Sequence, residues 1–155
     1  MDKKQLEEEL ERRLTSRGLL QYAWDYYAAF ENLYDKYPKV SEMYEVKYYL
    51  LCHSIELAMK AFLREKGFTR NQLLEIGHDL EKLIYILHEN GVLIDVGSME
   101  RTFSLNDYYK TKQFEYPQTG SKILPSLEEM KSSTHLLLSM VRNSITNELP
   151  RPSKK

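Results

Sequence analysis

The chain has 155 residues, of which 42% are hydrophobic and 29% are charged, and its net charge is −1. This composition excludes an intrinsically disordered chain and is sufficient for one buried core. The balanced charge excludes a polybasic duplex binder, because such proteins bind through many phosphate contacts. The single cysteine, Cys52, excludes an intrachain disulfide and a cysteine-based metal site, and it favours a cytoplasmic location. No apolar run is long enough to span a bilayer, so we expect no membrane contact.

Helical periodicity runs through nearly the whole chain and predicts an all-α, up-and-down bundle of about four main helices with shorter helices between them. A thin seam of three leucines, spaced by four, crosses the charged N-terminal stretch: Leu6, Leu10 and Leu14. This seam predicts an N-terminal helical extension over residues 1–18. The bundle is expected over residues 19–149, and residues 150–155 are expected to form a disordered basic tail.

Two long helices are predicted in the first half of the bundle. The first covers residues 19–37 and ends before Pro38, because proline cannot continue a helix. The longest helix is expected over residues 42–66, with Ser41 as its N-cap and Gly67 as its stop. One predicted apolar side of this helix comprises Met43, Val46, Leu50, Leu57, Ala61 and Phe62. The predicted polar strip comprises Glu56, Lys60 and Arg64.

The next segments are predicted to be shorter helices. Thr69 and Gln72 have the spacing of a capping box, which predicts a short turn of helix after Gly67. A further helix is expected over residues 79–90, with the His78 side chain capping its start.

Residues 91–124 are the least regular part of the chain. The Ser104-x-x-Asp107 spacing predicts a short helix through Tyr109, followed by a loop. A loop of this length inside a compact domain is more often functional than idle. The last helix is predicted to begin at residue 125 or 126, because proline suits the first turn.

None of the four histidines has the spacing of a helical metal site, so we expect neither a metal nor another cofactor. His53 lies on the apolar side of the longest helix and is expected to be a hydrogen-bonded core residue. On the last helix, Arg142 and Asn143 form a polar pair beside the core stripe. His135 lies two turns before Arg142 on the same face, about 10 Å along the axis, which is far for one concerted proton transfer.

Three segments of the chain have a distinctive order and spacing. Residues 48–63 read YYLLCHSIELAMKAFL, and residues 77–83 read GHDLEKL. A later segment contains Leu105-x-x-Tyr108 and then Phe114-Glu115-Tyr116-Pro117. In this order they resemble a HEPN domain (higher eukaryotes and prokaryotes nucleotide-binding), and the resemblance covers about residues 20–148.

The HEPN resemblance implies a compact helical bundle that is often a dimer. Many members are metal-independent ribonucleases or toxin partners in prokaryotic defence operons, and a nucleotidyltransferase is often encoded beside them. Their active site is Arg-x4–6-His on the last long helix. Arg142 and Asn143 match the start of this motif, but the histidine position is occupied by Asn147, Glu148 or Leu149.

The sequence therefore supports three hypotheses. The leading one is a non-catalytic HEPN-like module, which binds a partner protein, a nucleotide or RNA through Arg142, Asn143, His78 and Tyr109. The first rival is a metal-independent ribonuclease that combines Arg142 with a displaced histidine, either His135 or His78. The second rival is a structural helical adaptor without a ligand. A homodimer is expected, because 12 tyrosines and the N-terminal leucine seam leave apolar surface to cover.

Overall fold

The computed structural model describes residues 1–116 and 120–147, with the backbone alone for residues 146 and 147. These residues form seven α-helices and no strand: α1 (Lys3–Arg13), α2 (Ser16–Lys36), α3 (Tyr44–Glu65), α4 (Arg70–Ile76), α5 (Leu80–Glu89), α6 (Val96–Lys110) and α7 (Leu127–Asn147). The predicted all-α helical bundle is confirmed. The predicted tail over residues 150–155 lies outside the described residues, as do Glu148 and Leu149.

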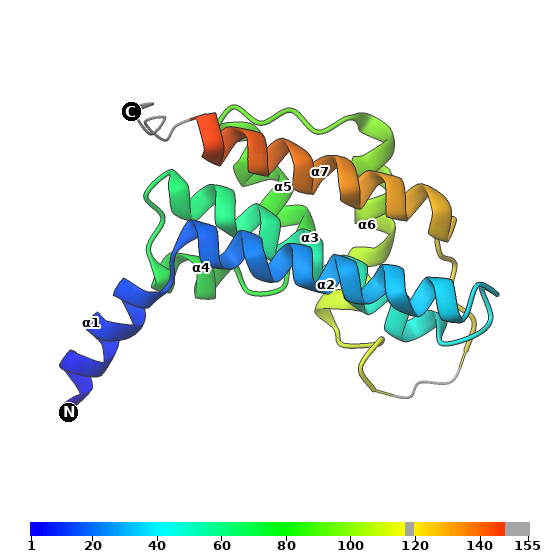
Figure 1. Ribbon diagram of the computed structural model, residues 1–155, viewed down its shortest axis with the longest axis horizontal. Coiled ribbons are helices and arrows are strands. Elements are labelled where there is room, and N and C mark those ends of the chain that lie inside the picture. Colours follow the sequence, from blue (N-terminus) through cyan, green and yellow to red (C-terminus); the bar gives the residue numbers. More distant parts are fainter. Residues whose placement is uncertain (117–119, 148–155) are drawn as a thin grey trace, which may run out of the picture.

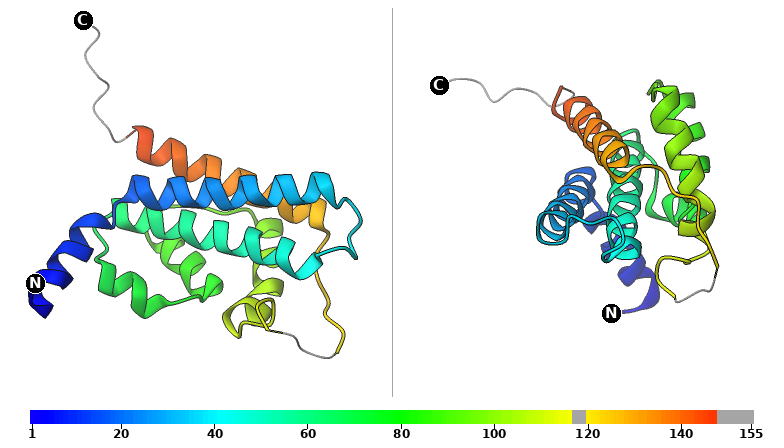
Figure 2. Two further views of the ribbon diagram at one scale, coloured as in Figure 1. Left: turned by 60° about the horizontal axis from the view of Figure 1, so that its bottom comes forward. Right: turned by 90° about the vertical axis from the view of Figure 1, so that its right-hand side faces the viewer.

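The bundle is built around α3. Helix α2 runs antiparallel to α3 and lies alongside it, and α7 packs on both of them (Figure 1). Helices α5 and α6 pack together and cover another side of α3 (Figure 2). Helix α1 projects away from the bundle at the start of α2 (Figure 1). Within residues 1–116 and 120–147, no helix has the length and apolarity that crossing a bilayer requires.

Local hydrogen bonds explain where the short helices begin. At α4, the Thr69 hydroxyl accepts from the Gln72 amide, and the Gln72 side chain accepts from the Thr69 amide, which confirms the predicted capping box. Asp2 and Gln5 form the same reciprocal pair at the start of α1. These caps satisfy backbone amides that the first turn of a helix leaves without partners.

The start of α3 differs from the prediction. Ser41 is not the N-cap, because the helix begins at Tyr44 after Met43, whose φ of 51° is left-handed and whose side chain makes no cap. The physical reason lies in the fully buried Lys47. Its ammonium donates to the carbonyl of Tyr37 and, at 2.9 Å, to that of Lys39. These bonds hold the connecting loop against the first turn and delay the start of the helix.

The buried sides of α3 also differ from the prediction. Met43 and Val46 are 46% and 41% exposed, although both were predicted on an apolar side. Glu56 and Lys60 were predicted as a polar strip, yet they are only 2% and 9% exposed. The reason is that α5 and α6 cover the Glu56 side of α3, while the side that carries Val46 stays open.

Helix α6 is longer than predicted, because its first turns bury polar residues such as Ser98 and Thr102. It begins after Asp95, whose side chain accepts from the Ser98 amide at 2.9 Å, and not at Ser104. The Ser98 hydroxyl donates to Ser133 on α7 at 3.0 Å, and the Thr102 hydroxyl donates to the Ser98 carbonyl at 2.8 Å. These buried polar contacts interrupt the apolar periodicity from which a helix is predicted.

Candidate functional site

A buried carboxylate on α3 collects polar side chains from three parts of the chain. Glu56 is 2% exposed, and His53 and Lys60 lie about one turn before and after it on the same helix. His78 lies in the connection between α4 and α5, and Tyr109 lies in the last turn of α6. We call these five residues the Glu56 site.

The Glu56 carboxylate receives hydrogen bonds from several directions. Lys60 Nζ donates to Oε1 at 2.7 Å, so these two members of the predicted polar strip pair with each other in the interior. His78 Nδ1 lies 2.9 Å from Oε2 and 3.1 Å from Oε1. The Tyr109 hydroxyl donates to Oε2. His53 Nδ1 lies 2.9 Å from the Tyr109 hydroxyl oxygen and 3.8 Å from Glu56 Oε2.

These contacts fix the tautomers of both imidazoles. Tyr109 has one hydroxyl proton and gives it to Glu56, so the contact with His53 requires the proton to be on His53 Nδ1. An ionised carboxylate can only accept, so His78 Nδ1 also carries a proton. Among the described residues, neither Nε2 atom makes a hydrogen bond. Both rings therefore direct Nδ1 inward and keep Nε2 for other contacts.

Burial and hydrogen bonding set the charges inside the site. Burial opposes the ionisation of Glu56, but the contacts with His53, Lys60 and Tyr109 outweigh it and lower the pKa of Glu56 to about 2. Burial and the nearby Glu56 charge raise the pKa of Tyr109 well above its usual value. At neutral pH the site therefore holds a carboxylate, balanced by the Lys60 ammonium, and an un-ionised tyrosine.

The exposure of the site increases from the carboxylate to the imidazoles. The Glu56 and Lys60 side chains are 3% and 11% exposed, whereas that of His53 is 19% and that of His78 is 53% exposed. The two histidines are therefore the part of the site that a ligand can reach. The carboxylate behind them acts as an anchor for the rings.

Aromatic rings support the His53 imidazole from two sides. The Tyr49 ring stacks on it with a centroid distance of 5.6 Å and an interplanar angle of 8°. The Tyr26 ring of α2 meets it edge-on at 4.5 Å. The position of the imidazole is thus fixed by ring packing as well as by its hydrogen bond to Tyr109.

His78 does not cap α5, contrary to the prediction. The N-cap is Asp79, whose side chain accepts from the Lys82 amide at 3.1 Å. Gly77 has a φ of 66°, a conformation that favours glycine, and it directs the chain away from the end of α4. The His78 ring then points to Glu56 and meets the Tyr109 ring at a centroid distance of 6.0 Å.

The predicted ligand-binding residues fall into two groups. His78 and Tyr109 come together at the Glu56 site, but Arg142 and Asn143 are exposed on α7. The Arg142 guanidinium lies over the Trp24 ring at 5.1 Å, and the His135 ring meets the same indole at 5.6 Å. We call Trp24, His135 and Arg142 the Trp24 group.

The two groups lie on different sides of α2. Trp24 contacts Arg142, and Tyr26 contacts His53. These two α2 residues are two positions apart, which corresponds to about 200° around a helix. Within one chain, Arg142 is therefore grouped with His135 and not with His78.

Sequence reasoning missed Glu56, Lys60 and the role of His53. A usable signal was present, because His53, Glu56 and Lys60 follow one another at spacings of three and four residues on α3. Such residues lie on one helix face, and a run of ionisable groups there is unusual in an otherwise apolar helix. The contribution of Tyr109 depends on how α6 packs, which the local spacing does not reveal.

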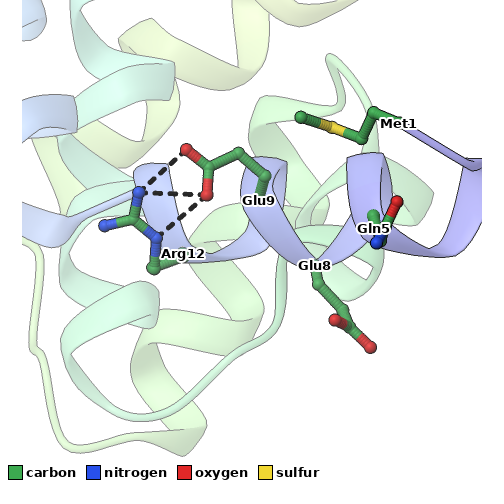
Figure 3. Close-up of a pocket in the computed structure, with 5 residues that line it drawn as sticks. All are labelled: Met1, Gln5, Glu8, Glu9 and Arg12. Carbon is green, nitrogen blue, oxygen red and sulfur yellow. Dashed lines mark hydrogen bonds and ion pairs between the residues drawn. The ribbon is translucent and has the colours of Figure 1, made fainter.

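A hollow on α1 does not add a second site. It has a volume of about 580 Å³ and is lined by Met1, Gln5, Glu8, Glu9 and Arg12. Figure 3 shows that these side chains all come from the projecting N-terminal segment, where Glu9 and Arg12 pair with each other at 2.8 Å. Within the described part of the chain, no three His, Cys, Asp or Glu side chains are arranged to hold a metal ion.

Comparisons of the chain with protein-family models, curated proteins and solved structures gave no match. The HEPN resemblance therefore stays a prediction, based on the three segments quoted above.

Proposed function

We propose that this chain is a non-catalytic HEPN-like module that binds the phosphate group of a nucleotide or of RNA at the Glu56 site. The observation that carries the proposal is the bond between the exposed His78 ring and the buried Glu56 carboxylate. A surface histidine with no structural role has no need of a buried charge to orient it. A ligand-binding histidine does, because an oriented ring loses less entropy on binding.

The chemistry of the two imidazoles suits a phosphate oxygen. Each ring keeps Nε2 on the side away from its Nδ1 contact. Nε2 is an acceptor in the neutral Nδ1–H ring, so the imidazolium form, with a second proton on Nε2, is the one that donates a charge-assisted hydrogen bond to an anion. Lys60 compensates the Glu56 charge at 2.7 Å, which weakens the repulsion between the carboxylate and an approaching phosphate. Phosphate is therefore the proposed ligand of the two rings in their imidazolium form.

The same geometry argues against catalysis at this site. Metal-free RNA cleavage needs a base for the 2′-hydroxyl and a cation beside the charge that develops on phosphorus. Arg142, the cation that the HEPN resemblance implies, is on a different side of α2, beside Trp24. Lys60 is nearly buried and already bound to Glu56. The Glu56 site therefore lacks the arginine that the HEPN resemblance implies beside the phosphate, and its Lys60 is held by Glu56.

Calorimetric titration of the full chain tests the proposal, with a nucleoside monophosphate and with a short single-stranded RNA. Both are expected to bind, and His78→Ala should weaken binding at least about tenfold, since a charge-assisted hydrogen bond is lost. His135→Ala is the matched control, because this exposed histidine is outside the Glu56 site and its loss should leave the affinity unchanged. Absence of binding, or equal effects of the two substitutions, would refute the proposal.

A second candidate function is metal-independent RNA cleavage at the Trp24 group. It is favoured by one observation, the packing of both His135 and Arg142 on the Trp24 indole at 5.6 and 5.1 Å. The test is incubation of RNA with the protein in the presence of a chelator. Cleavage that is abolished by His135→Ala and retained by His78→Ala would establish this function in place of the first. An intact RNA would reject it.

The partner of the module is proposed to be a second copy of the chain, with a nucleotidyltransferase as a further partner that the HEPN resemblance implies. The exposed side chains of Leu6 and Leu10 on α1 support self-association, because they leave apolar surface on a helix that projects from the bundle. If no ligand binds at either group, the chain is the structural adaptor of the third hypothesis.

A further inference from the structure

An aromatic pocket lies beside the Glu56 site, between α2 and α3. It has a volume of about 300 Å³ and is lined by Tyr22, Asp25, Tyr26, Ala29 and Leu50. The volume is at the lower end of the range for small-molecule sites. Its walls are apolar and aromatic apart from the Asp25 carboxylate, and the Tyr22 side chain is largely exposed, so the pocket opens to solvent.

The pocket and the Glu56 site share a wall. The Tyr26 ring that lines the pocket contacts the His53 ring at a centroid distance of 4.5 Å. Leu50 lines the pocket as well and is three residues before His53, which is about 4.5 Å along the axis of α3. One small ligand can therefore occupy the pocket and reach the His53 imidazole with another part.

Among the described residues that line this pocket, Asp25 carries the one charged group. Its Oδ1 accepts from the Gln21 side-chain amide at 2.9 Å, and both side chains are exposed on α2. Among the described residues, its other oxygen has no hydrogen-bond partner. The pocket thus offers flat aromatic surface next to a carboxylate acceptor, and it suits a planar group that donates adjacent N–H bonds.

We infer that the pocket binds the guanine base of the nucleotide, while its phosphate reaches the histidines of the Glu56 site; this inference rests on the function proposed above. Guanine presents two adjacent donors, N1–H and the N2 amino group, on its Watson–Crick edge, so it matches a carboxylate in a bidentate pair. Adenine presents an amino group next to a ring nitrogen that is an acceptor, and that nitrogen would face the Asp25 carboxylate unfavourably. Every base stacks on tyrosine, so Asp25 supplies the discrimination.

The guanidinium group of a partner's arginine is the competing occupant of this pocket. It is also planar, donates paired N–H bonds to carboxylates and stacks on aromatic rings. It carries no phosphate, however, and would leave the neighbouring imidazoles without a ligand. The proximity of the pocket to His53 therefore favours the nucleotide.

The experiment titrates the full chain with guanosine, inosine and adenosine monophosphates. Guanosine monophosphate should bind at least about tenfold more tightly than adenosine monophosphate, because hydrogen bonds to a charged group discriminate strongly. Inosine monophosphate, which lacks the N2 amino group, should fall between them. Asp25→Asn should remove the preference for guanosine monophosphate, because the amide no longer offers two acceptor oxygens, and should raise the affinity for adenosine monophosphate, because its acceptor ring nitrogen no longer faces a carboxylate. Asp35→Asn, on the same helix and exposed, is the matched control and should change neither affinity.

The outcomes separate this inference from the function on which it rests. Equal affinities for the three nucleotides, all lowered by His78→Ala, would overturn the guanine inference while phosphate binding at the Glu56 site stands. A chain that binds none of the nucleotides would overturn both. Binding of free arginine that Asp25→Asn abolishes, without binding of guanosine monophosphate, would assign the pocket to a guanidinium and overturn the inference.

Discussion

The Nδ1 atom of His78 lies 2.9 Å from Oε2 of Glu56, although the His78 side chain is 53% exposed and that of Glu56 is only 3% exposed. The two residues are 22 positions apart in the sequence. Packing of α5 and α6 on α3 brings them together, since His78 precedes α5 and Tyr109 of α6 binds the same carboxylate. A buried charge thus orients a ring at the surface, and this relation connects the stability of the bundle to the proposed ligand site.

The substitution Glu56→Gln should lower the free energy of unfolding by about 3–5 kcal/mol. It removes the negative charge and leaves the Lys60 ammonium buried without its counter-ion. Urea denaturation of the two proteins measures the difference. Glu75→Gln, an exposed position on α4, is the control and should change the stability by less than about 0.5 kcal/mol. A loss below about 1 kcal/mol for Glu56→Gln would show that the buried pair contributes little.

Acid should destabilise the native chain through Glu56. The pKa of this carboxyl is about 2 in the folded chain against an ordinary value of 4.5, so its stabilising contribution is complete above pH 4.5. The contribution is lost as the pH falls towards 2 and amounts to roughly 3 kcal/mol. Denaturation at several pH values should show this loss in the native chain, beyond the loss seen in Glu56→Gln. If the free energy of unfolding falls equally with pH in the two proteins, the lowered pKa assigned to Glu56 is wrong.

Two apolar residues of α3 should respond very differently to truncation. Leu51 is fully buried, so Leu51→Ala should cost about 2–5 kcal/mol through the cavity that it leaves. Val46 is 41% exposed, and Val46→Ala should cost less than about 0.5 kcal/mol. Thermal or urea unfolding of the two variants provides the comparison. Equal costs would mean that the Val46 side of α3 is covered in solution, as in a dimer that forms on this face.

The chain is expected to form a homodimer, and light scattering at tens of micromolar should give twice the chain mass of 18.4 kDa. The proposed contact is the α1 seam, where Leu6 and Leu10 are 48% and 37% exposed. Leu10→Lys should therefore shift the mass towards that of a monomer. Leu93→Lys, at a position that is 80% exposed and outside α1, should not change it. If the unmodified chain has the mass of a monomer, the predicted homodimer is wrong.

The sequence predicted the fold class well and the buried faces of the central helix less well. Helical periodicity, the Thr69 capping box and the stop at Gly67 are local signals, and each corresponds to a local structure. The burial of Glu56 depends on the packing of α6. The α6 residue that binds Glu56 is Tyr109, which lies 53 residues further along the chain. Spacing within α3 therefore could not show whether its polar strip faces solvent or another helix.

The candidate site was predicted in part, because His78 and Tyr109 were named and Glu56 was not. The GHDL segment indicated that His78 is important, but it predicted a capping role for this residue. Asp79 accepts the capping hydrogen bond of α5 instead. Arg142 and His78 were predicted to belong to one ligand-binding site, or to combine as an arginine with a displaced histidine. Their separation depends on where Trp24 and Tyr26 fall around α2, which becomes clear only when the packing of α7 is known.

The hydrogen bonds of the Glu56 site join residues that are 22, 53 and 56 positions apart in the sequence. An unfolded chain cannot hold these groups together, so a ligand of the site binds the native state alone. By thermodynamic linkage, such a ligand at 100 times its dissociation constant raises the unfolding free energy by about 2.7 kcal/mol. It also protects the amides of α6 from hydrogen exchange, because release of α6 from α3 would take Tyr109 out of the site.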